Sequence, residues 1–503
     1  MNNHVRIILV VALTACNGTG TTAAPDAPEL AAPATAHALS TETPAGLSMA
    51  VLRPVSGLST LPAGCGVQNP NATLYRNSEV QPMVIADPGN PAHLVANFQQ
   101  DRWSKFGGNA VVTYVSNNGG LDWHPARAQP KFTHCAGGTA ANGGDYEVAT
   151  DSWLAYGVHG TVFQVVFAIN QVASYTTAIV VSRSTDGGET WSDPVSLIAD
   201  TNPEFFDDRP TVTVDPRHPD RVYVVWDRVD DTSTSTDEHW VQPFYLARSF
   251  DNGVTWETPR DVHDTAVNSG TLGHDLVVLA DGTLVDAYDL ATDTTNSAEV
   301  LRSTDGGATW GPPIALAPLP ATWTIPNPDG AGPGIRNAAL PLLAVGRDGT
   351  TIDAVIASAA ADGTQHVAFT QSGDKGMTWS APVVIDHAPA GTSAFTPMIA
   401  VDRDGRIGVT YYDTRNNTPD PATVLADQWL VTCSAHCTQP GAWTESHVAG
   451  SFDVLRAPAT GLGLMLGDYT GLVGGPNGTF VSVFDRTNAD ASNPQDVVAA
   501  ILR

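Results

Sequence analysis

Basic residues are scarce in this chain of 503 residues, in which 24 Lys and Arg stand against 52 Asp and Glu. The formal net charge is therefore −28. An acidic surface of this kind repels the phosphate backbone of nucleic acids, so no nucleic acid partner is expected. Solubility is the simplest physical explanation of the acidity.

Several familiar chemical motifs are also missing. The sequence holds no Gly-x-Ser-x-Gly, no phosphate-binding loop and no His-x-x-x-His pair, and its cysteines and histidines show no zinc spacing. Carboxylates crowd at Asp207-Asp208 and Asp230-Asp231, which leaves calcium open, but no EF-hand spacing occurs. We therefore expect no cofactor and assign no metal ligand.

Long apolar runs are absent as well. The run Ile7–Leu13, which follows Arg6, is too short to span a bilayer as a permanent helix. It leads into Leu-Thr-Ala-Cys at residues 13–16, which resembles the bacterial lipobox. We expect a lipoprotein signal over 1–15 and a lipid on Cys16, with an ordinary signal peptide as the alternative. The chain would then be exported and anchored to the bacterial envelope, at the outer membrane or cell surface, and would contact membrane only through this lipid.

The composition after the signal sequence predicts a tether followed by one domain. Residues 16–62 are rich in Ala, Thr and Pro, which suits a disordered tether. Without Cys16, four cysteines remain, and an even number in an exported protein suggests disulfides. We expect Cys433–Cys437 to close a small loop and Cys65–Cys135 to pin the N-terminal segment to the domain at 63–503.

One eight-residue pattern, Ser-x-Asp-x-Gly-x-Thr-Trp, recurs through that domain with a period of roughly 50–70 residues, which is typical of a repeat architecture. Its five copies begin at Ser116, Ser184, Ser249, Ser303 and Ser372. The first copy departs from the others, with Asn118 for Asp and Asp122 for Thr. The Asp can accept backbone hydrogen bonds from one or two residues ahead, and the Gly supplies a positive φ. Each copy therefore predicts a structural hairpin turn between two strands.

Short β-branched runs between Gly, Asn, Asp and Pro turns predict an all-β fold of four-stranded units. A count of innermost strands favours seven units, with six as the alternative. The expected strands are Pro82–Ala86, Ser152–Tyr156, Pro210–Val214, Asp275–Leu279, Leu340–Val345, Pro397–Val401 and Tyr469–Val473. Thr73–Tyr75 would complete the last unit, and Trp443 would follow a sixth turn whose box is replaced by the Cys433–Cys437 loop.

The eight-residue patterns are Asp-boxes, and the chain resembles the sialidase (neuraminidase) superfamily of BNR-repeat β-propellers over nearly its whole mature length. The resemblance implies a β-propeller with loops converging at the mouth of a central channel. Sialidases have six blades and use three arginines on the substrate carboxylate, a Tyr nucleophile with a Glu, and an Asp acid/base. Their early Arg-Ile-Pro signature is absent here, and Tyr75-Arg76-Asn77 is the nearest fragment.

Candidate site residues lie in the loops that would meet at the channel mouth. Tyr412 or Tyr469 is the candidate nucleophile, with Glu147 as its base. Asp208 or Asp413 is the candidate acid, and Asp468 is a further catalytic candidate. The candidate clamp is Arg209, Arg415 and Arg486, with Arg102 and Arg336 as further substrate-binding arginines. A structural alternative is that the repeated aromatic-Asp-Arg signature, as in Trp226-Asp227-Arg228 and Phe484-Asp485-Arg486, forms ion pairs between blades.

Three functions stay open at this point. The first is a sialidase-like glycoside hydrolase that cleaves terminal acidic sugars from glycans, acting as a monomer. The second is a non-catalytic propeller that binds glycans or a protein partner. The third is another polysaccharide-active enzyme, such as a uronic-acid lyase, on the same scaffold. Fold does not decide among them.

Overall fold

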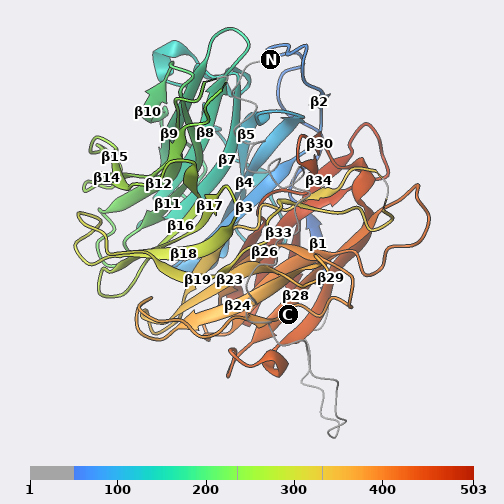
Figure 1. The fold of residues 1–503 in the computed structure, drawn as a ribbon. Coiled ribbons are helices and arrows are strands. Elements are labelled where there is room, and N and C mark those ends of the chain that lie inside the picture. The colour runs from blue at the N-terminus through green and yellow to red at the C-terminus, as the bar shows by residue number, and fades with distance from the viewer. Residues whose placement is uncertain (1–49, 235, 331) are drawn as a thin grey trace, which may run out of the picture.

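The structure, a computed structural model, describes residues 50–234, 236–330 and 332–503. Within these residues the regular structure is almost entirely strand, so the predicted all-β fold is confirmed (Figure 1). The only helical segments in this part are short 3-10 turns at His134–Ala136, Ala140–Asn142, Pro440–Ala442, Val454–Arg456 and Pro476–Gly478. None of its helices has the length and apolar character to cross a membrane. The predicted signal at 1–15 and Cys16 lie outside the described residues.

The described strands pair into seven successive groups of four antiparallel neighbours. The first three groups are β3 (Val80–Asp87), β4 (Asn90–Trp103), β5 (Gly108–Ser116) and β6 (His124–Pro125); β7 (Val148–Tyr156), β8 (Val162–Asn170), β9 (Thr176–Ser184) and β10 (Val195–Asp200); and β11 (Phe205–Val214), β12 (Val222–Asp231), β14 (Phe244–Ser249) and β15 (Arg260–His263). Groups four and five are β16 (Ser269–Val278), β17 (Leu284–Thr292), β18 (Asn296–Ser303) and β19 (Ile314–Pro318); and β22 (Leu342–Val345), β23 (Ile352–Ala359), β24 (Gln365–Ser372) and β25 (Val383–Val384). Groups six and seven are β26 (Ala394–Val401), β27 (Ile407–Asp413), β28 (Leu425–Cys433) and β29 (Thr444–Asp453); and β32 (Gly471–Gly474), β33 (Phe480–Thr487), β34 (Gln495–Leu502) and β1 (Ala50–Pro54).

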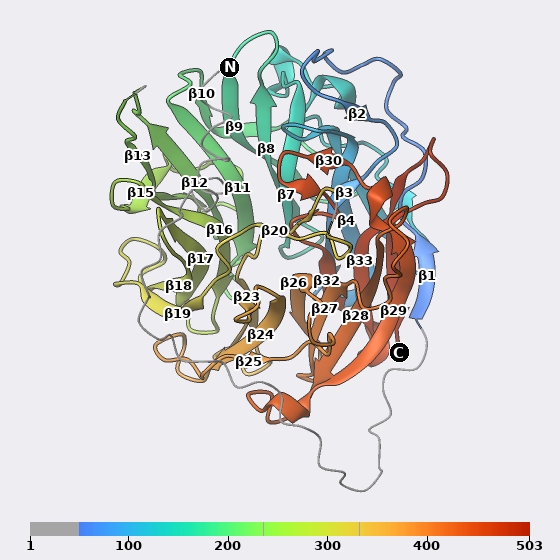
Figure 2. The ribbon, with the colours of Figure 1, turned by 45° about the vertical axis from the view of Figure 1, so that its right-hand side comes forward.

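The first strand of each group lies on the inside of the molecule. These inner strands (β3, β7, β11, β16, β22, β26 and β32) contact one another in that order, and β32 contacts β3. The groups fan out from this common centre, as in a β-propeller (Figure 2). Each inner strand overlaps the range predicted for it, because an apolar run between turn residues marks each one.

The last group is completed by a strand that the sequence did not indicate. β1 pairs with β34, from Ala50 opposite Leu502 to Pro54 opposite Val498. The prediction that Thr73–Tyr75 fills this place is wrong, because Leu74–Tyr75 forms β2 and pairs with the end of β4. The predicted tether at 16–62 therefore ends too late, since its last part joins the sheet and buries Val55.

The Asp-boxes join the third and fourth strands of their groups, as predicted for hairpin turns. In the second copy, Thr190 N donates to Asp186 Oδ1 at 2.9 Å and Gly188 N donates to Ser184 Oγ at 2.9 Å. The main donor to the Asp thus lies four residues ahead, not one or two. Gly188 has a φ of 85°, and its carbonyl accepts a hydrogen bond from Trp191 Nε1. The Trp191 ring therefore stabilises the turn.

Both predicted disulfides are present. Cys433–Cys437 replaces the box in the sixth group, where Trp443 Nε1 donates to the Cys437 carbonyl at 3.0 Å, as Trp191 does to Gly188. Cys65–Cys135 joins positions 70 residues apart and ties the N-terminal segment to the loop after the first group. The sixth turn therefore keeps the Trp geometry of a box without its sequence.

Apolar side chains fill the spaces between neighbouring groups. Phe98 of the first group packs in one cluster with Ile501 of the last, and Phe163 of the second group packs with Trp226 of the third. The strands are therefore buried on both faces, and few charged side chains are tolerated between groups.

Two long connections leave the groups and build a separate small sheet, here called the cap sheet. It contains β20 (Thr324–Ile325), β21 (Ile335–Arg336), β31 (Gly463–Leu464) and β30 (Ala459–Thr460), and β21 runs parallel to β31. The first connection joins groups four and five, and the second joins groups six and seven. A further short strand, β13 (Trp240–Gln242), pairs with β12 and β16.

Candidate functional site

A backbone irregularity recurs within or shortly before every inner strand. One residue there has a positive φ in each group: Gln81, Asp151, Arg209, Gly273, Ala339, Thr396 and Gly467. In five of the seven strands the pairing register shifts at this point. Bulges of this kind redirect side chains, and a positive φ costs a residue other than Gly on the order of 1–3 kcal/mol. Because this positive φ recurs in every group, it is a feature of the repeated fold. It directs the neighbouring side chains toward the centre of the molecule.

The aromatic-Asp signature holds these bulges in place. Asp227 Oδ2 accepts from Gly273 N at 3.1 Å, and Asp485 Oδ2 accepts from Gln81 N at 3.2 Å, in each case from the next group. Neither Asp pairs with the Arg that follows it. The structural alternative is thus right that this signature links neighbouring groups. Asp227 and Asp485 do so by carboxylate-to-amide hydrogen bonds, Asp227 also pairs with His274 of the next group, and Arg228 forms an ion pair with Asp200 of the preceding group.

The charged residues nearest the centre converge on Asp468. Arg336 from β21 donates to Asp468 Oδ1 from Nε at 2.5 Å and to Oδ2 from Nη2, and Arg209 Nη2 donates to Oδ2 at 3.0 Å. Burial alone would raise the pKa of Asp468, but the two guanidinium groups lower it to about 2. Asp468 is therefore an ionised carboxylate with no exposed side-chain surface. We call Asp151, Asp208, Asp468, Arg102, Arg209 and Arg336 the axial cluster.

The pKa of Asp208, in the same cluster, is shifted in the opposite direction. Its Oδ2 lies 3.7 Å from Arg209 Nε. Burial raises the pKa of Asp208 well above its ordinary value, and Asp151 adds to this, while Arg209 offsets only part of it. The Arg209 guanidinium thus lies between two carboxyl groups whose pKa values are shifted in opposite directions.

Arg102 completes the cluster from the first group. It is buried, its Nη1 donates to Gln99 Oε1 at 3.2 Å, and burial together with the neighbouring Arg336 lowers its pKa to about 10. Its Nε and the Nε and Nη1 of Arg209 have no hydrogen-bond partner in the described part of the chain. Arg209 and Arg336 thus bind the Asp468 carboxylate directly, and Arg102 adds a third buried guanidinium group to the cluster.

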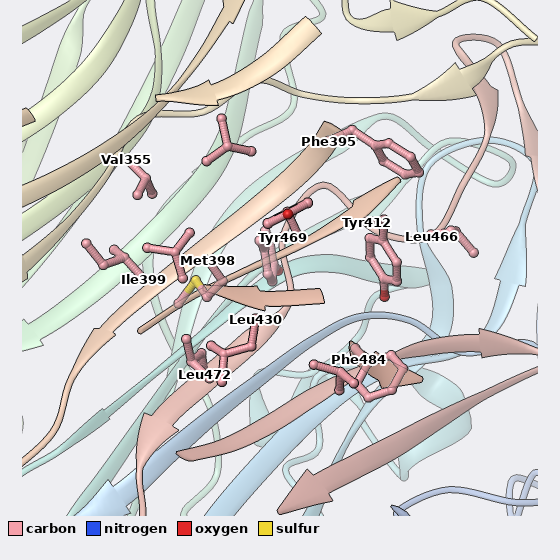
Figure 3. Packing of buried hydrophobic residues seen from close by; sticks show 14 of the residues in the cluster. Val355, Phe395, Met398, Ile399, Tyr412, Leu430, Leu466, Tyr469, Leu472 and Phe484 are labelled. Carbon is pink, nitrogen blue, oxygen red and sulfur yellow. The ribbon is translucent and has the colours of Figure 1, made fainter. Parts of the chain in front are cut away.

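The two candidate tyrosines lie in the core. The Tyr412 hydroxyl donates to the Asp485 carbonyl at 3.0 Å, and the Tyr469 hydroxyl donates to the Ser152 carbonyl at 2.9 Å. Figure 3 shows both rings among buried hydrophobic side chains, with Tyr412 beside Phe395. Burial raises the pKa of both hydroxyls well above the ordinary value, which is the wrong direction for a nucleophile.

Glu147 is not placed to activate either tyrosine. Its carboxylate accepts backbone N–H donors from Gln171, Val172 and Ala173 at 2.8–2.9 Å, so it organises the turn after β8. The predicted pair of a tyrosine nucleophile with Glu147 is therefore wrong. A sequence pattern cannot distinguish a carboxylate that caps a loop from one that serves as a base.

The predicted arginine clamp is not assembled either. Arg415 binds Asp413 at 2.6 Å and Glu445 at 2.7 Å, and it stacks on Trp429 at 3.8 Å, all within the sixth group. Arg486 lies on β33 opposite Asp496. Of the three, Arg209 alone reaches the axial cluster, where Arg336 and Arg102 join it.

His274, which was not selected as a site residue, lies deep between the third and fourth groups. Its Nδ1 is 2.6 Å from Asp286 Oδ2 and its Nε2 is 3.1 Å from Asp227 Oδ1. Burial would lower the pKa of His274, but the two carboxylates raise it to about 9. Its partners come from β17 and β12, so no local spacing could have revealed this triad.

The cluster is largely shielded from solvent. Trp323, on the connection that builds the cap sheet, lies over the Arg209 guanidinium with 5.1 Å to the ring centroid. Arg209 is 7% and Arg336 13% exposed. Beneath them is a cavity of about 20 Å³ lined in part by Asp151, Trp153 and Tyr469, which has room for roughly one water molecule.

Comparison with known proteins supports the repeat. A family model described as a BNR repeat-like domain matches residues 174–383, which contain the second, third, fourth and fifth Asp-boxes. The predicted resemblance to BNR-repeat proteins is thereby confirmed. No curated protein matches the chain.

Among solved structures, the chain is similar to a Hadza microbial sialidase (16% identity, TM-score 0.45, covering 82% of this chain and 74% of that one). It is also similar to the NanB sialidase of Streptococcus pneumoniae (11%, 0.43, 86% and 94%) and to an α-L-arabinofuranosidase of Fusarium graminearum (16%, 0.40, 71% and 93%). Likenesses at this level carry no information on substrate.

Proposed function

We propose that this BNR-repeat protein is an exported glycoside hydrolase that removes terminal acidic sugars from glycans, with the axial cluster as its site. The observation that carries this is the pair of arginines, Arg209 and Arg336, bound to Asp468, with Arg102 buried in the same cluster. Nε of Arg102 and Nε and Nη1 of Arg209 have no hydrogen-bond partner among the described residues. Planar guanidinium groups recognise a sugar carboxylate by paired hydrogen bonds.

The fold and the location belong to the same proposal. The seven groups would be the blades of a closed propeller, which the cyclic contacts of the inner strands and the pairing of β1 with β34 support. Lipidation of Cys16 would anchor the protein, as monomer, to the envelope. A closed ring would hold residues as distant as Arg102 and Asp468 at one centre.

Asp208 and Asp468 supply the chemistry in this proposal. A pair of carboxyl groups with opposite protonation is the arrangement that glycosidases use. Asp208, whose pKa burial raises, would give its proton to the leaving oxygen as the glycosidic C–O bond breaks. Asp468, ionised, would stabilise the positive charge on the sugar until water adds to its anomeric carbon, and Asp208, left as a carboxylate, would take the proton that this water releases. The cap sheet would have to move, because the Asp468 side chain has no exposed surface and that of Asp208 is only 14% exposed.

Release of a fluorescent aglycone tests this proposal. Sialosides and uronides should be cleaved by the wild type and by Tyr412→Phe, since the Tyr412 hydroxyl is buried and donates to the Asp485 backbone carbonyl. Asp208→Asn should lose roughly 10²–10⁴-fold in kcat, the usual contribution of a general acid. No turnover by the wild type, or full activity of Asp208→Asn, would contradict the proposal.

A second candidate is a non-catalytic propeller that binds glycans. The polar groups expected to do chemistry are already paired within the protein, which favours this candidate. Arg209 and Arg336 are bound to Asp468, and the hydroxyls of Tyr412 and Tyr469 donate to backbone carbonyls. In this case acidic glycans would bind without turnover, and Asp208→Asn would leave their dissociation constants unchanged.

A further inference from the structure

A second cleft lies away from the axial cluster, on the outer part of the third group. Its cavity of about 430 Å³ falls in the size range of small-molecule sites. Phe205 at the start of β11 and Tyr245 on β14 line it, both half-buried. Arg228, Asp230, Asp261 and Asp264 supply its charges. We call it the rim cleft.

The wall of the rim cleft is flat and rigid. The Arg228 guanidinium lies over the rings of Phe205 and Tyr245, at 4.4 Å and 5.4 Å from their centroids. Its Nη1 also donates to Asp207 Oδ1 at 3.1 Å and to Asp200 Oδ2. Aromatic rings held in this way present a preformed apolar surface to a sugar ring while costing little conformational entropy on binding.

The charge of the rim cleft is negative. Arg228 is neutralised by Asp200 and Asp207 behind the wall, which leaves Asp230, Asp261 and Asp264 facing the cavity. Arg260, on the same strand as Asp261, donates to the Gly307 carbonyl. An acidic sugar is repelled here, whereas an ammonium group finds three hydrogen-bond acceptors.

The carboxyl groups of Asp261 and Asp264 lie close together at the rim cleft, which favours a cationic ligand. Partial burial and then the Asp264 carboxyl, through a hydrogen bond and its charge, raise the pKa of Asp261 to about 7. The pKa of Asp230 is also raised, by burial and by Glu204. Like charges placed this close favour the binding of a cationic group between them.

We propose that the rim cleft binds a sugar that carries a free amino group. The sugar ring would stack on Tyr245 and its ammonium group would lie between Asp261 and Asp264. Sugar hydroxyl groups would find an acceptor in Asp230. This site does not depend on the axial cluster, and it selects the opposite charge.

Calorimetric titration of the full chain with a glucosamine tetramer tests the proposal, at a pH that keeps the amine protonated. The N-acetylglucosamine tetramer is the matched neutral ligand. We expect the neutral tetramer to bind at least roughly tenfold more weakly, the usual effect of losing one charge-assisted hydrogen bond. Asp264→Asn should raise the dissociation constant by a similar factor, and Tyr245→Ala should raise it for both ligands.

Two controls separate the site from other effects. Asp374→Asn removes the same charge from an exposed Asp-box in the fifth group, and it should bind like the wild type. Asp208→Asn should also bind like the wild type, whatever the outcome of the hydrolase assays. Equal binding of the two tetramers, no binding of the glucosamine tetramer, or an equal loss in Asp374→Asn would each overturn the proposal.

Discussion

Aspartate serves two opposite purposes at the rim and at the axis of this molecule. In the Asp-boxes, hydrogen bonds from backbone N–H groups and from Thr and Ser hydroxyls lower the pKa of the exposed Asp305 and the partly exposed Asp374 to about 2. At the axis, burial raises the pKa of Asp208 and takes that of Asp275 to about 7. The surrounding donors and water, and not the residue type, therefore decide whether an Asp closes a turn or holds a proton.

Removing Asp468 should produce the largest loss of stability. Asp468→Asn leaves Arg209 and Arg336 buried without their carboxylate, and breaking a buried pair in this way costs about 3–5 kcal/mol. Urea unfolding should show this loss, while Asp305→Asn, the matched change at the rim, should cost far less. Equal losses at the two positions would remove the distinction between axis and rim.

Removal of the disulfide Cys65–Cys135 should cause the second-largest loss of stability. This disulfide closes 70 residues, and the chain-entropy estimate for a loop of this length is about 4 kcal/mol, of which measured values often fall short. Cys65→Ser with Cys135→Ser should lower the urea midpoint clearly. Cys433→Ser with Cys437→Ser, which opens a loop of separation 4, should have a smaller effect, and the reverse order would contradict this account.

His274 should make stability depend on alkaline pH. Its pKa of about 9 lies above the ordinary value of about 6.5, so its contribution is complete below pH 6.5 and is lost as the pH rises through 9. The loss should be at most about 3 kcal/mol. His274→Gln should flatten this part of the curve of unfolding free energy against pH. A wild type with no slope between pH 7 and 10 would show that the triad is not charged.

The smallest effect is expected in the first Asp-box, where the exchanged residues compensate one another. Asn118 Nδ2 donates to Asp122 Oδ2 at 2.7 Å, and Asp122 N donates to Asn118 Oδ1 at 2.9 Å. Asn118→Asp alone would place two carboxylates together and cost about 0.5–1 kcal/mol. Adding Asp122→Thr should restore the thermal midpoint; failure of that rescue would show that the exchange is not compensatory.

The fold was largely predictable because its signals are local and repeated. Each Asp-box fixes a turn between two strands, so one well-understood pattern locates five hairpins, and Trp443 marks the sixth. The sequence did not predict β1, because Ala50–Pro54 carries no turn signal and pairs with the far end of the chain. A pairing between residues separated by almost the whole sequence leaves no local trace.

The site was predicted only in part because its contacts come from unrelated connections. Arg209, Arg336 and Asp468 were all selected, but their union depends on the cap sheet, whose two connections carry no repeat. Tyr412 and Glu147 were selected for their residue types, and the structure uses them in the core and in a turn. The position of a residue in a repeat predicts where its backbone lies in the fold, but not which residue its side chain contacts.

Carbon-13 NMR of aspartate carboxyl groups tests most directly the claim that neighbouring axial carboxyl groups hold opposite protonation. Spectra of the wild type at neutral pH should lose a protonated carboxyl signal in Asp208→Asn and an ionised one in Asp468→Asn. Titration should move the second only near pH 2. If both resonances titrate together near the ordinary value of about 4, the axial cluster has no acid and base to offer and the proposed chemistry fails.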